Sequence, residues 1–206
     1  MGNKPHRLCK SNPKGFTLIE VMIAIAMTGI VMGAIYGIFF SANQTYFTQD
    51  AVTDTQQRAR IGLDFMVRDI RIAGLDPMGT AVAGIEAATA TKIRFTADRN
   101  MNGAIENINR ERLTYEYDGN RLCLYEGADL GTPPPPATET LIDNVSALSF
   151  IYRDVDGIAI VLPVSASNLA NIRTVDISIT CQGKDYKRKD ISRTLQTRIS
   201  CRNLGM

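Results

Sequence analysis

The sequence is poor in the residues on which most enzyme sites depend. Its 206 residues include one histidine, His6, no tryptophan, and four cysteines that form no Cys-x-x-Cys pair. It also lacks a phosphate-binding loop and a dinucleotide-binding fingerprint. Because His6 falls in an N-terminal stretch that we expect to be removed, the mature chain would hold no Ser-His or Cys-His pair and no histidine metal site. These absences argue against an enzyme.

Acidic residues are missing from the first fifteen positions, which carry four basic side chains, Lys4, Arg7, Lys10 and Lys14. Without these four, 19 of the 23 basic side chains remain against 21 acidic ones, so the net charge changes from +2 to −2. A nearly neutral remainder offers no electrostatic footprint for nucleic acid, and we expect no nucleic-acid partner. The length suits one globular domain with an appendage.

One long apolar run follows the basic start. Residues 16–40 are interrupted by only three clearly polar residues, Thr17, Glu20 and Thr28. Twenty-five helical residues extend about 37 Å, which is enough to cross a hydrocarbon core of about 30 Å. Positive charges precede the run and the first charges after it are acidic. The positive-inside rule therefore predicts a single-pass helix with its N-terminus in the cytoplasm and the remainder outside.

The N-terminus differs from an ordinary secretory signal. Such a signal has an apolar run of 7–15 residues followed by a small-residue cleavage site. Here the run is longer, and the small residue, Gly15, comes before it. Cleavage after Gly15 would remove the basic leader and keep the helix, which is the opposite of what an ordinary signal peptidase does.

Glu20 is the second unusual feature, because a carboxylate one turn into a membrane helix is costly. One interpretation is a capping box, Thr17-x-x-Glu20, favoured also by the helix dipole. The other requires cleavage after Gly15, which creates a new ammonium group on Phe16. In a helical stack of subunits, Glu20 of one chain would then pair with the free N-terminus of a neighbour and neutralise two charges in lipid.

The segment from Lys14 to Val21, KGFTLIEV, resembles the class III signal of type IV pilins and type II secretion pseudopilins. The resemblance implies that a prepilin peptidase cuts between Gly15 and Phe16, that Phe16 is N-methylated, and that Glu20 guides assembly. The implied partners are other major and minor pilins, the prepilin peptidase, and the assembly platform at the bacterial inner membrane. The implied destination is a pilus or pseudopilus.

Three glycines recur at every fourth position of the apolar run, Gly29, Gly33 and Gly37. Small residues at this spacing allow helices to approach closely in lipid. The same glycines also weaken the helix locally. Both interpretations fit a subunit that leaves a bilayer for a filament.

The helix is expected to continue beyond the membrane as an amphipathic extension over residues 41–76. Apolar residues recur there at steps of mostly three, four or seven, namely Val52, Ala59, Leu63, Met66, Val67, Ile70 and Ala73. Gly74 and Pro77 then favour an end to the helix. The expected organisation is therefore a leader (1–15), a membrane or filament-core helix (16–40), the extension (41–76) and a head domain (77–206).

The head domain is expected to consist of strands. The predicted strands are 92–96, 112–117, 121–125, 146–153, 174–181 and 195–201, with Asp118-Gly119 as a hairpin turn. The four prolines at 133–136 indicate an exposed loop. The predicted fold class is α+β, with an antiparallel sheet packed on the second half of the helix.

Three further segments resemble PilW-type minor pilins, which are related to the pseudopilins GspJ and PulJ. These segments are residues 68–77, 95–98 with 111–115, and 145–152. The resemblance implies a low-abundance subunit near the pilus tip that helps to start assembly. Two alternatives stay open: a pseudopilin of a type II secretion system, and a membrane-anchored extracytoplasmic binding domain that never polymerises.

A loop in the head matches part of a calcium-binding pattern. Residues 98–105 fit the first eight positions of D-x-[DN]-x-[DN]-G-x-I, but Asn109 stands where the bidentate Glu belongs. One interpretation is a weak calcium site, and the other is a polar turn between two strands. The candidate ligands are Asp98, Asn100, Asn102 and Glu106.

The three cysteines beyond the leader are Cys123, Cys181 and Cys201. A domain outside the cytoplasm could form one disulfide from them and leave one thiol. Cys181 and Cys201 are the preferred pair because both lie in the last quarter of the chain. The alternative is three buried, reduced cysteines.

Overall fold

The computed structural model of the protein describes residues 15–127 and 138–204. The predictions for the basic leader and for the four-proline loop lie outside these residues. The chain divides into two compact units, Met1–Tyr46 and Phe47–Met206, which are described separately below. The predicted amphipathic extension therefore belongs almost entirely to the same unit as the head.

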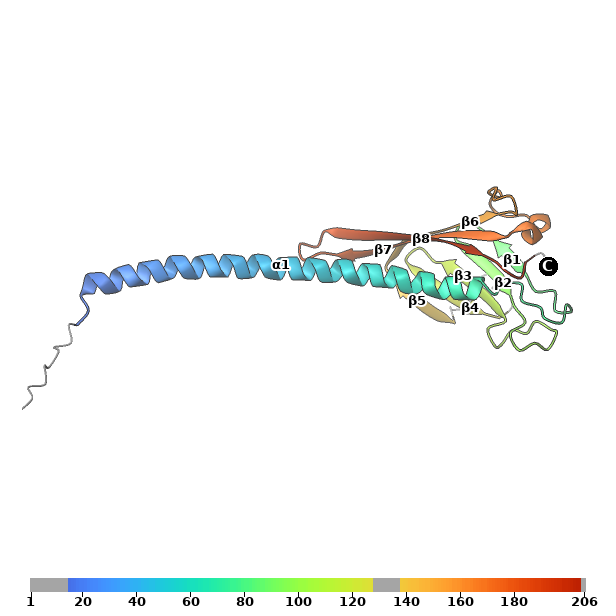
Figure 1. Cartoon of the computed structure of the whole chain (residues 1–206), viewed down its shortest axis with the longest axis horizontal. Helices are drawn as coiled ribbons and strands as arrows, with labels where there is room; N and C mark the ends of the chain where they lie inside the picture. Colours follow the sequence, from blue (N-terminus) through green and yellow to red (C-terminus); the bar gives the residue numbers. More distant parts are fainter. Residues whose placement is uncertain (1–14, 128–137, 205–206) are drawn as a thin grey trace, which may run out of the picture. The chain divides into compact units, whose positions relative to one another are not determined.

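The first unit contains the start of helix α1, which spans Leu18–Ile70 (Figure 1). Every residue from Gly15 to Ala42 is exposed, including the apolar side chains on all sides of the helix. Helix α1 is a candidate membrane span, because an 18-residue stretch of it has a mean hydropathy of 2.3. A helix that is apolar all round and has no cover of its own is expected to be surrounded by lipid or by other subunits.

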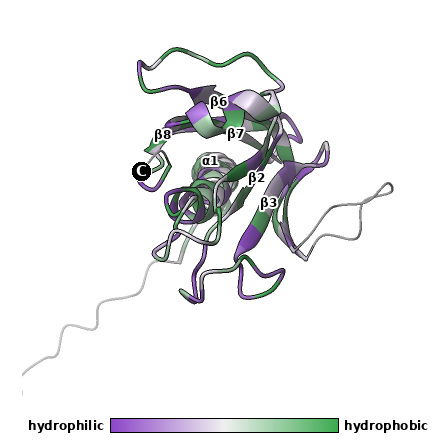
Figure 2. Ribbon diagram, turned by 90° about the vertical axis from the view of Figure 1, so that its right-hand side faces the viewer, coloured by the Kyte–Doolittle hydropathy of each residue, from purple (hydrophilic) through white to green (hydrophobic). Residues whose placement is uncertain are grey.

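The second unit places the later part of α1 between two antiparallel sheets (Figure 2). One sheet has the order β1-β2-β3-β4-β5, and the other has the order β6-β7-β8. The strands are β1 (Ile85–Ala88), β2 (Lys92–Thr96), β3 (Arg112–Tyr117), β4 (Arg121–Glu126), β5 (Glu139–Asp143), β6 (Val145–Arg153), β7 (Thr174–Lys184) and β8 (Asp190–Ser200). A short 3-10 helix, η1 (Ala166–Asn171), precedes β7. The predicted α+β class is confirmed, although the strands form two sheets rather than one.

The predicted apolar stripe of α1 forms the centre of this unit. Its residues Ala59, Leu63, Met66 and Ile70 are buried and belong to one continuous core with side chains from both sheets. Gly62 brings the helix closest to the strands. A Cβ atom at this position would collide with Ile142 and would lie 3.3 Å from Leu122 Cδ2 and 3.2 Å from Ile179 Cδ1. The helix therefore approaches both sheets at Gly62.

The boundaries of most strands follow the alternation in the sequence. Strands β2 and β3 coincide with the predicted ranges, and β4 and β6 are each one residue longer. Strands β7 and β8 pair over eleven residues each, so both extend beyond their predicted ranges toward their shared turn. The prediction omitted the short strands β1 and β5. The helix ends at Ile70, and Gly74 follows in a left-handed conformation (φ 80°) with its N–H donating to Thr96 O at 2.9 Å.

The preferred disulfide between Cys181 and Cys201 was wrong. Both residues are free thiols, as is Cys123, and all three are buried. In the β7–β8 ladder Cys181 pairs with Arg193, whereas Cys201 N–H donates to Arg173 O at the other end of the ladder. Eight residues of strand separate the two positions, about 26 Å, whereas a disulfide needs Cα atoms within about 7 Å. Burial raises the pKa of Cys201 to about 11, which leaves its thiol unreactive at neutral pH.

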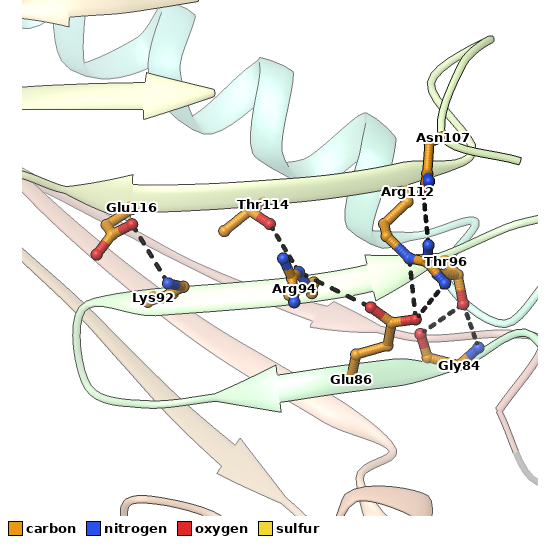
Figure 3. Close-up of polar contacts among 9 residues, drawn as sticks. All are labelled: Gly84, Glu86, Lys92, Arg94, Thr96, Asn107, Arg112, Thr114 and Glu116. Atoms are coloured by element: carbon orange, nitrogen blue, oxygen red, sulfur yellow. Dashed lines mark hydrogen bonds and ion pairs between the residues drawn. The ribbon is translucent and has the colours of Figure 1, made fainter. Parts of the chain in front are cut away.

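The outer face of the five-stranded sheet is polar, and ion pairs and hydrogen bonds link side chains of β1, β2 and β3 across it (Figure 3). Lys92 Nζ lies 3.4 Å from Glu116 Oε2, and Arg112 Nη2 lies 3.0 Å from Glu86 Oε1. Arg94 Nε also donates to Thr114 Oγ1 at 3.2 Å. Each partly exposed pair of this kind contributes little to the stability of the fold. We therefore interpret this face as a solvated surface whose side-chain pairs help to fix the register of the strands.

Candidate processing and assembly site

The start of α1 is built as a capping box. Thr17 N–H and Thr17 Oγ1–H both donate to Glu20 Oε2 at 2.8 Å, and Glu20 N–H lies 3.4 Å from Thr17 Oγ1. These contacts satisfy amide groups that the first turn of a helix leaves without partners. The capping interpretation of Glu20 therefore has a geometric basis. Gly15 and Phe16 precede the helix, and both are exposed.

Glu20 forms no ion pair with a cationic side chain of the described residues, so the capping box does not neutralise its charge. Glu20 lies on the same strip of the helix surface as the apolar side chains of Phe16, Val21, Ala24 and Ile25. A carboxylate held in such a strip can bind a cation presented by another chain. Its pairing with the N-terminus of a neighbouring subunit stays a prediction, as do cleavage after Gly15 and methylation of Phe16.

A buried ionic cluster in the head was not predicted from the sequence. Asp69, in the last turn of α1, is only 3% exposed. Its Oδ2 accepts from Tyr115 OH at 2.7 Å and from Arg110 Nη2 at 2.9 Å, and its Oδ1 accepts from Arg99 Nη2 at 2.9 Å. The cluster joins the end of the helix to β3 and to the β2–β3 loop. One signal could have revealed it: Asp69 stands on the apolar stripe, three residues after Met66.

The cluster shifts the pKa values of its members in a consistent way. Burial alone would raise the pKa of Asp69, but hydrogen bonds from Tyr115, Arg110 and Arg99 outweigh it and hold that pKa below its ordinary value. Burial, followed by the negative charge of Asp69, raises the pKa of Tyr115. The carboxylate is therefore ionised and the phenol neutral at neutral pH. This arrangement fits a structural lock between helix and loop.

The predicted calcium loop connects β2 to β3. Asp98 is fully buried, and its two oxygens accept from Asn102 N–H at 3.2 Å and Gly103 N–H at 2.9 Å. Asn100 Oδ1 accepts from Asn102 N–H at 2.9 Å. Gly103 has a φ of 80°, as a sharp turn requires. The loop is thus closed by its own hydrogen bonds, as the turn interpretation expects.

Two glutamates complete this loop. Glu106 accepts from the amide groups of Asn100 and Asn102 at 3.4 and 3.2 Å. Glu111 is buried, and its oxygens accept from Asn100 N–H at 3.3 Å and Glu106 N–H at 2.8 Å. Over residues 15–127 and 138–204, no group of three or more His, Cys, Asp or Glu side chains is arranged to hold a metal ion. Calcium binding by Asp98, Asn100, Asn102 and Glu106 stays a prediction.

Two family models match the chain. The model of the prokaryotic N-terminal methylation motif matches residues 10–36. The model of prepilin peptidase-dependent protein B matches residues 49–201, about three quarters of the chain. This chain belongs to the prepilin peptidase-dependent protein B family. Together, the motif and the family show a type IV pilin-like protein, and the predicted resemblance to type IV pilins is confirmed.

Among curated proteins, the chain is similar to the pilin-like protein PilA3 of Thermus thermophilus, with 25% identity over 70% of this chain and 69% of that protein. Among solved structures, it is similar to a type IV-like pilin from Thermus thermophilus, with a TM-score of 0.49 and 9% identity, covering 73% of this chain and 98% of that one. The family is one of structural pilins and not of enzymes. A prepilin signal implies processing by a prepilin peptidase and pilin partners.

Proposed function

We propose that the mature chain is a minor pilin: a structural subunit near the tip of a type IV pilus that helps to start filament assembly. The observation that carries the proposal is the stretch of α1 from Leu18 to Phe40, which is apolar and exposed on every side, and most of which lies within the methylation motif matched at residues 10–36. Within one chain such a helix has no stable environment in water. It needs lipid before assembly and other helices afterwards.

The proposed sequence of events begins with insertion into the inner membrane, with the basic leader in the cytoplasm and the head outside. The prepilin peptidase cuts between Gly15 and Phe16, and Phe16 is methylated. Glu20 then pairs with the N-terminus of a neighbouring subunit while the assembly platform moves the helix from bilayer to filament. The ion pair neutralises two charges that would otherwise each be isolated in an apolar medium. It therefore favours the alignment of neighbouring subunits that brings Glu20 to the partner's N-terminus.

A patch on the head supports contacts with other minor subunits. Strand β6 ends at Arg153 and β7 begins at Thr174, so the connection between them lies at the end of the sheet opposite to the β7–β8 turn. Three large apolar side chains of this connection are exposed: Val155, Ile158 and Val161. Exposed apolar side chains gathered in one loop are typical of a surface that another protein covers.

Two alternatives fit the same N-terminal motif or the same anchor. A type II secretion pseudopilin would use Glu20 and the apolar helix in the same way but would stay in the cell envelope. A membrane-anchored binding domain would retain its leader and would have no use for Glu20. The family match counts against the second alternative.

Deletion of the gene, followed by counting of surface pili, tests the proposed role. We expect far fewer pili, with the remaining ones of normal thickness, because a subunit that starts assembly controls number rather than diameter. Gold-labelled antibody against the head should mark filament ends and not their length. Normal pilus numbers together with a secretion defect would favour the pseudopilin alternative.

A further inference from the structure

Strand β8 forms one edge of the three-stranded sheet, whose order is β6-β7-β8 (Figure 2). It pairs with β7 over eleven residues, about 36 Å of strand, and the register does not shift along this length. The strand contains no proline. An unbroken edge of this length is a template on which another chain can add a strand.

The other edges of the two sheets are better protected. Strands β1 and β5 have only four and five residues, and each has a register shift against its neighbour. At the end of β6, Ile160 N–H donates to Tyr152 O at 2.8 Å, so part of the β6–β7 connection covers that edge. Short strands, bulges and covering segments are devices that prevent unwanted pairing of edges. Among the edge strands of the part of the chain that the structure describes, β8 alone lacks all three.

Two backbone hydrogen bonds show which groups of β8 point away from the sheet. Gln182 N–H donates to Asn144 O at 2.8 Å, on the side of β6, so Ser192, which lies opposite Gln182, points outward. Cys201 N–H belongs to the alternate set and donates across the ladder to Arg173 O at 2.9 Å. The N–H and C=O groups of every second residue of β8 therefore face outward, including those of Ser192, Thr194, Gln196 and Arg198.

Arg193 places a positive charge at this edge. Its Nη1 donates to Ser192 O at 3.1 Å, which is the only hydrogen bond to the outward-facing backbone groups of β8 within residues 15–127 and 138–204. Arg193 is exposed, and no carboxylate of these residues pairs with it. The edge therefore offers backbone donors and acceptors together with a cation that an acidic side chain of another chain can neutralise.

We propose that the outer edge of β8 binds an extended strand of a neighbouring pilin-like subunit, which joins the sheet through backbone hydrogen bonds. The inference rests on the proposed function, and it names one contact by which the head joins its neighbours. A prepilin signal implies pilin partners for this chain. Strand addition is a known mode of recognition in which main-chain hydrogen bonds supply affinity and alternate side chains supply specificity.

The side chains of β8 define the strand that fits. Leu195 and Ile199 pack on the core, whereas Thr194 and Gln196 are exposed. The added strand is therefore expected to alternate apolar and polar residues in the same way, because neighbouring strands share their two faces. It is also expected to carry an acidic side chain next to Arg193.

The backbone contact is tested at Gln196, whose N–H faces outward. Gln196→Pro removes this donor and keeps the ladder with β7, whereas Gln196→Thr keeps the donor and changes only the side chain. Each full-length variant replaces the unsubstituted chain in its native cells, and sheared filaments are probed with an antibody against the head. We expect Gln196→Pro to lower incorporation about tenfold, because a carbonyl group of the partner loses its donor, and Gln196→Thr to leave it unchanged. Equal thermal midpoints of the two variants in detergent verify that the proline variant is folded.

Two further measurements decide the question if the proline variant folds poorly. Arg193→Gln should lower incorporation severalfold, whereas Arg202→Gln, at an exposed position beyond β8, should not. A benzophenone amino acid in place of Thr194 should crosslink on illumination to an extended segment of a chain that carries a prepilin methylation motif. Mass spectrometry of the crosslinked peptide identifies that segment.

Three results would overturn the proposal: equal incorporation of the folded Gln196→Pro and Gln196→Thr variants, equal incorporation of Arg193→Gln and Arg202→Gln, or crosslinks only to helical segments or to proteins without the motif. In each of these cases the unsubstituted chain is still found in filaments, so the proposed function stands. Absence of the unsubstituted chain from filaments would overturn both the proposed function and this inference.

Discussion

Tyr115 in β3 donates a hydrogen bond of 2.7 Å to Asp69, which precedes it by 46 residues and lies in the last turn of α1. With Arg99 and Arg110, this contact fixes the helix end to the five-stranded sheet and its loop. The last turn of α1 is therefore joined to the sheet by a charged lock in addition to apolar packing.

Replacing Asp69 by alanine should destabilise the head by about 3–5 kcal/mol, because a buried ionic cluster loses its only anion. Tyr115→Phe removes one hydrogen bond to a charged group and should cost about 2 kcal/mol. The measurement is denaturant unfolding of the full chain in detergent, followed by near-ultraviolet circular dichroism. Asp64→Ala, at an exposed position of the same helix, is the control and should change stability by less than about 0.5 kcal/mol. Equal effects of the two aspartate substitutions would contradict the lock.

The same lock predicts a dependence on acid. The pKa of Asp69 is lower in the folded chain than its ordinary value, so its stabilisation is complete above that ordinary value, near pH 4. It is lost as the pH falls through the lower folded value. The stability difference between the unsubstituted chain and Asp69→Ala should therefore shrink below about pH 4. If the stability difference between the two chains stays constant from neutral pH into this acid range, the charge of Asp69 does not stabilise the fold.

Gly62 should tolerate no larger side chain. Gly62→Val gains helix propensity but must displace Ile142 and crowd Ile179, and we expect a net loss of about 1–3 kcal/mol in the stability of the head. Gln56→Val, at an exposed position of α1, is the matched control. It should cost less than about 0.7 kcal/mol, the range of helix propensities. Comparable losses of stability at the two positions would show that the close packing at Gly62 does not contribute to the stability of the head.

The two interpretations of Glu20 can be separated by variants of the capping box. Thr17→Val removes the hydroxyl partner and keeps the carboxylate, whereas Glu20→Gln keeps a hydrogen-bonding side chain and removes the charge. If Glu20 pairs with a neighbouring N-terminus, Glu20→Gln should strongly reduce incorporation into sheared filaments and Thr17→Val should leave it near normal. Membrane insertion and processing should be unchanged in both, as judged by immunoblots of membrane fractions. Equal defects in the two variants would favour capping as the whole role.

The loop after β2 should depend on Asp98 for its shape. Asp98→Ala leaves Gly103 N–H without its acceptor and removes one of the two acceptors of Asn102 N–H, and it should cost about 1–3 kcal/mol. The calcium interpretation is tested in the same thermal unfolding experiment. It expects calcium to raise the midpoint of the unsubstituted chain relative to EDTA, and to have no such effect on Asp98→Ala. Equal midpoints with calcium and with EDTA would reject a calcium site.

Local patterns in the sequence were sufficient to predict the helix and much of the head. The apolar run is continuous in the sequence and the capping box joins residues within one helical turn, so composition and spacing alone reveal them. Alternation likewise located β2, β3 and β7, whose core-facing residues such as Val175, Ile177 and Ile179 are buried. Strands β1 and β5 have only four and five residues and little alternation, which explains why they were missed.

Contacts between distant residues were not predictable in this way. Asp69 meets partners 30, 41 and 46 residues later in the chain, and no short pattern records such pairings. The disulfide prediction failed for the same reason, because closeness in sequence was taken for closeness in space. The register of β7 and β8 places Cys181 and Cys201 at opposite ends of one ladder.

The most direct test is intact-mass and N-terminal peptide analysis of the protein recovered from membranes and from sheared surface filaments. We predict a mature chain that begins at Phe16, carries one additional methyl group, and is present in the filament fraction. A chain that keeps its leader, or one that is cut after the apolar run, would contradict the account and leave an anchored or secreted binding domain.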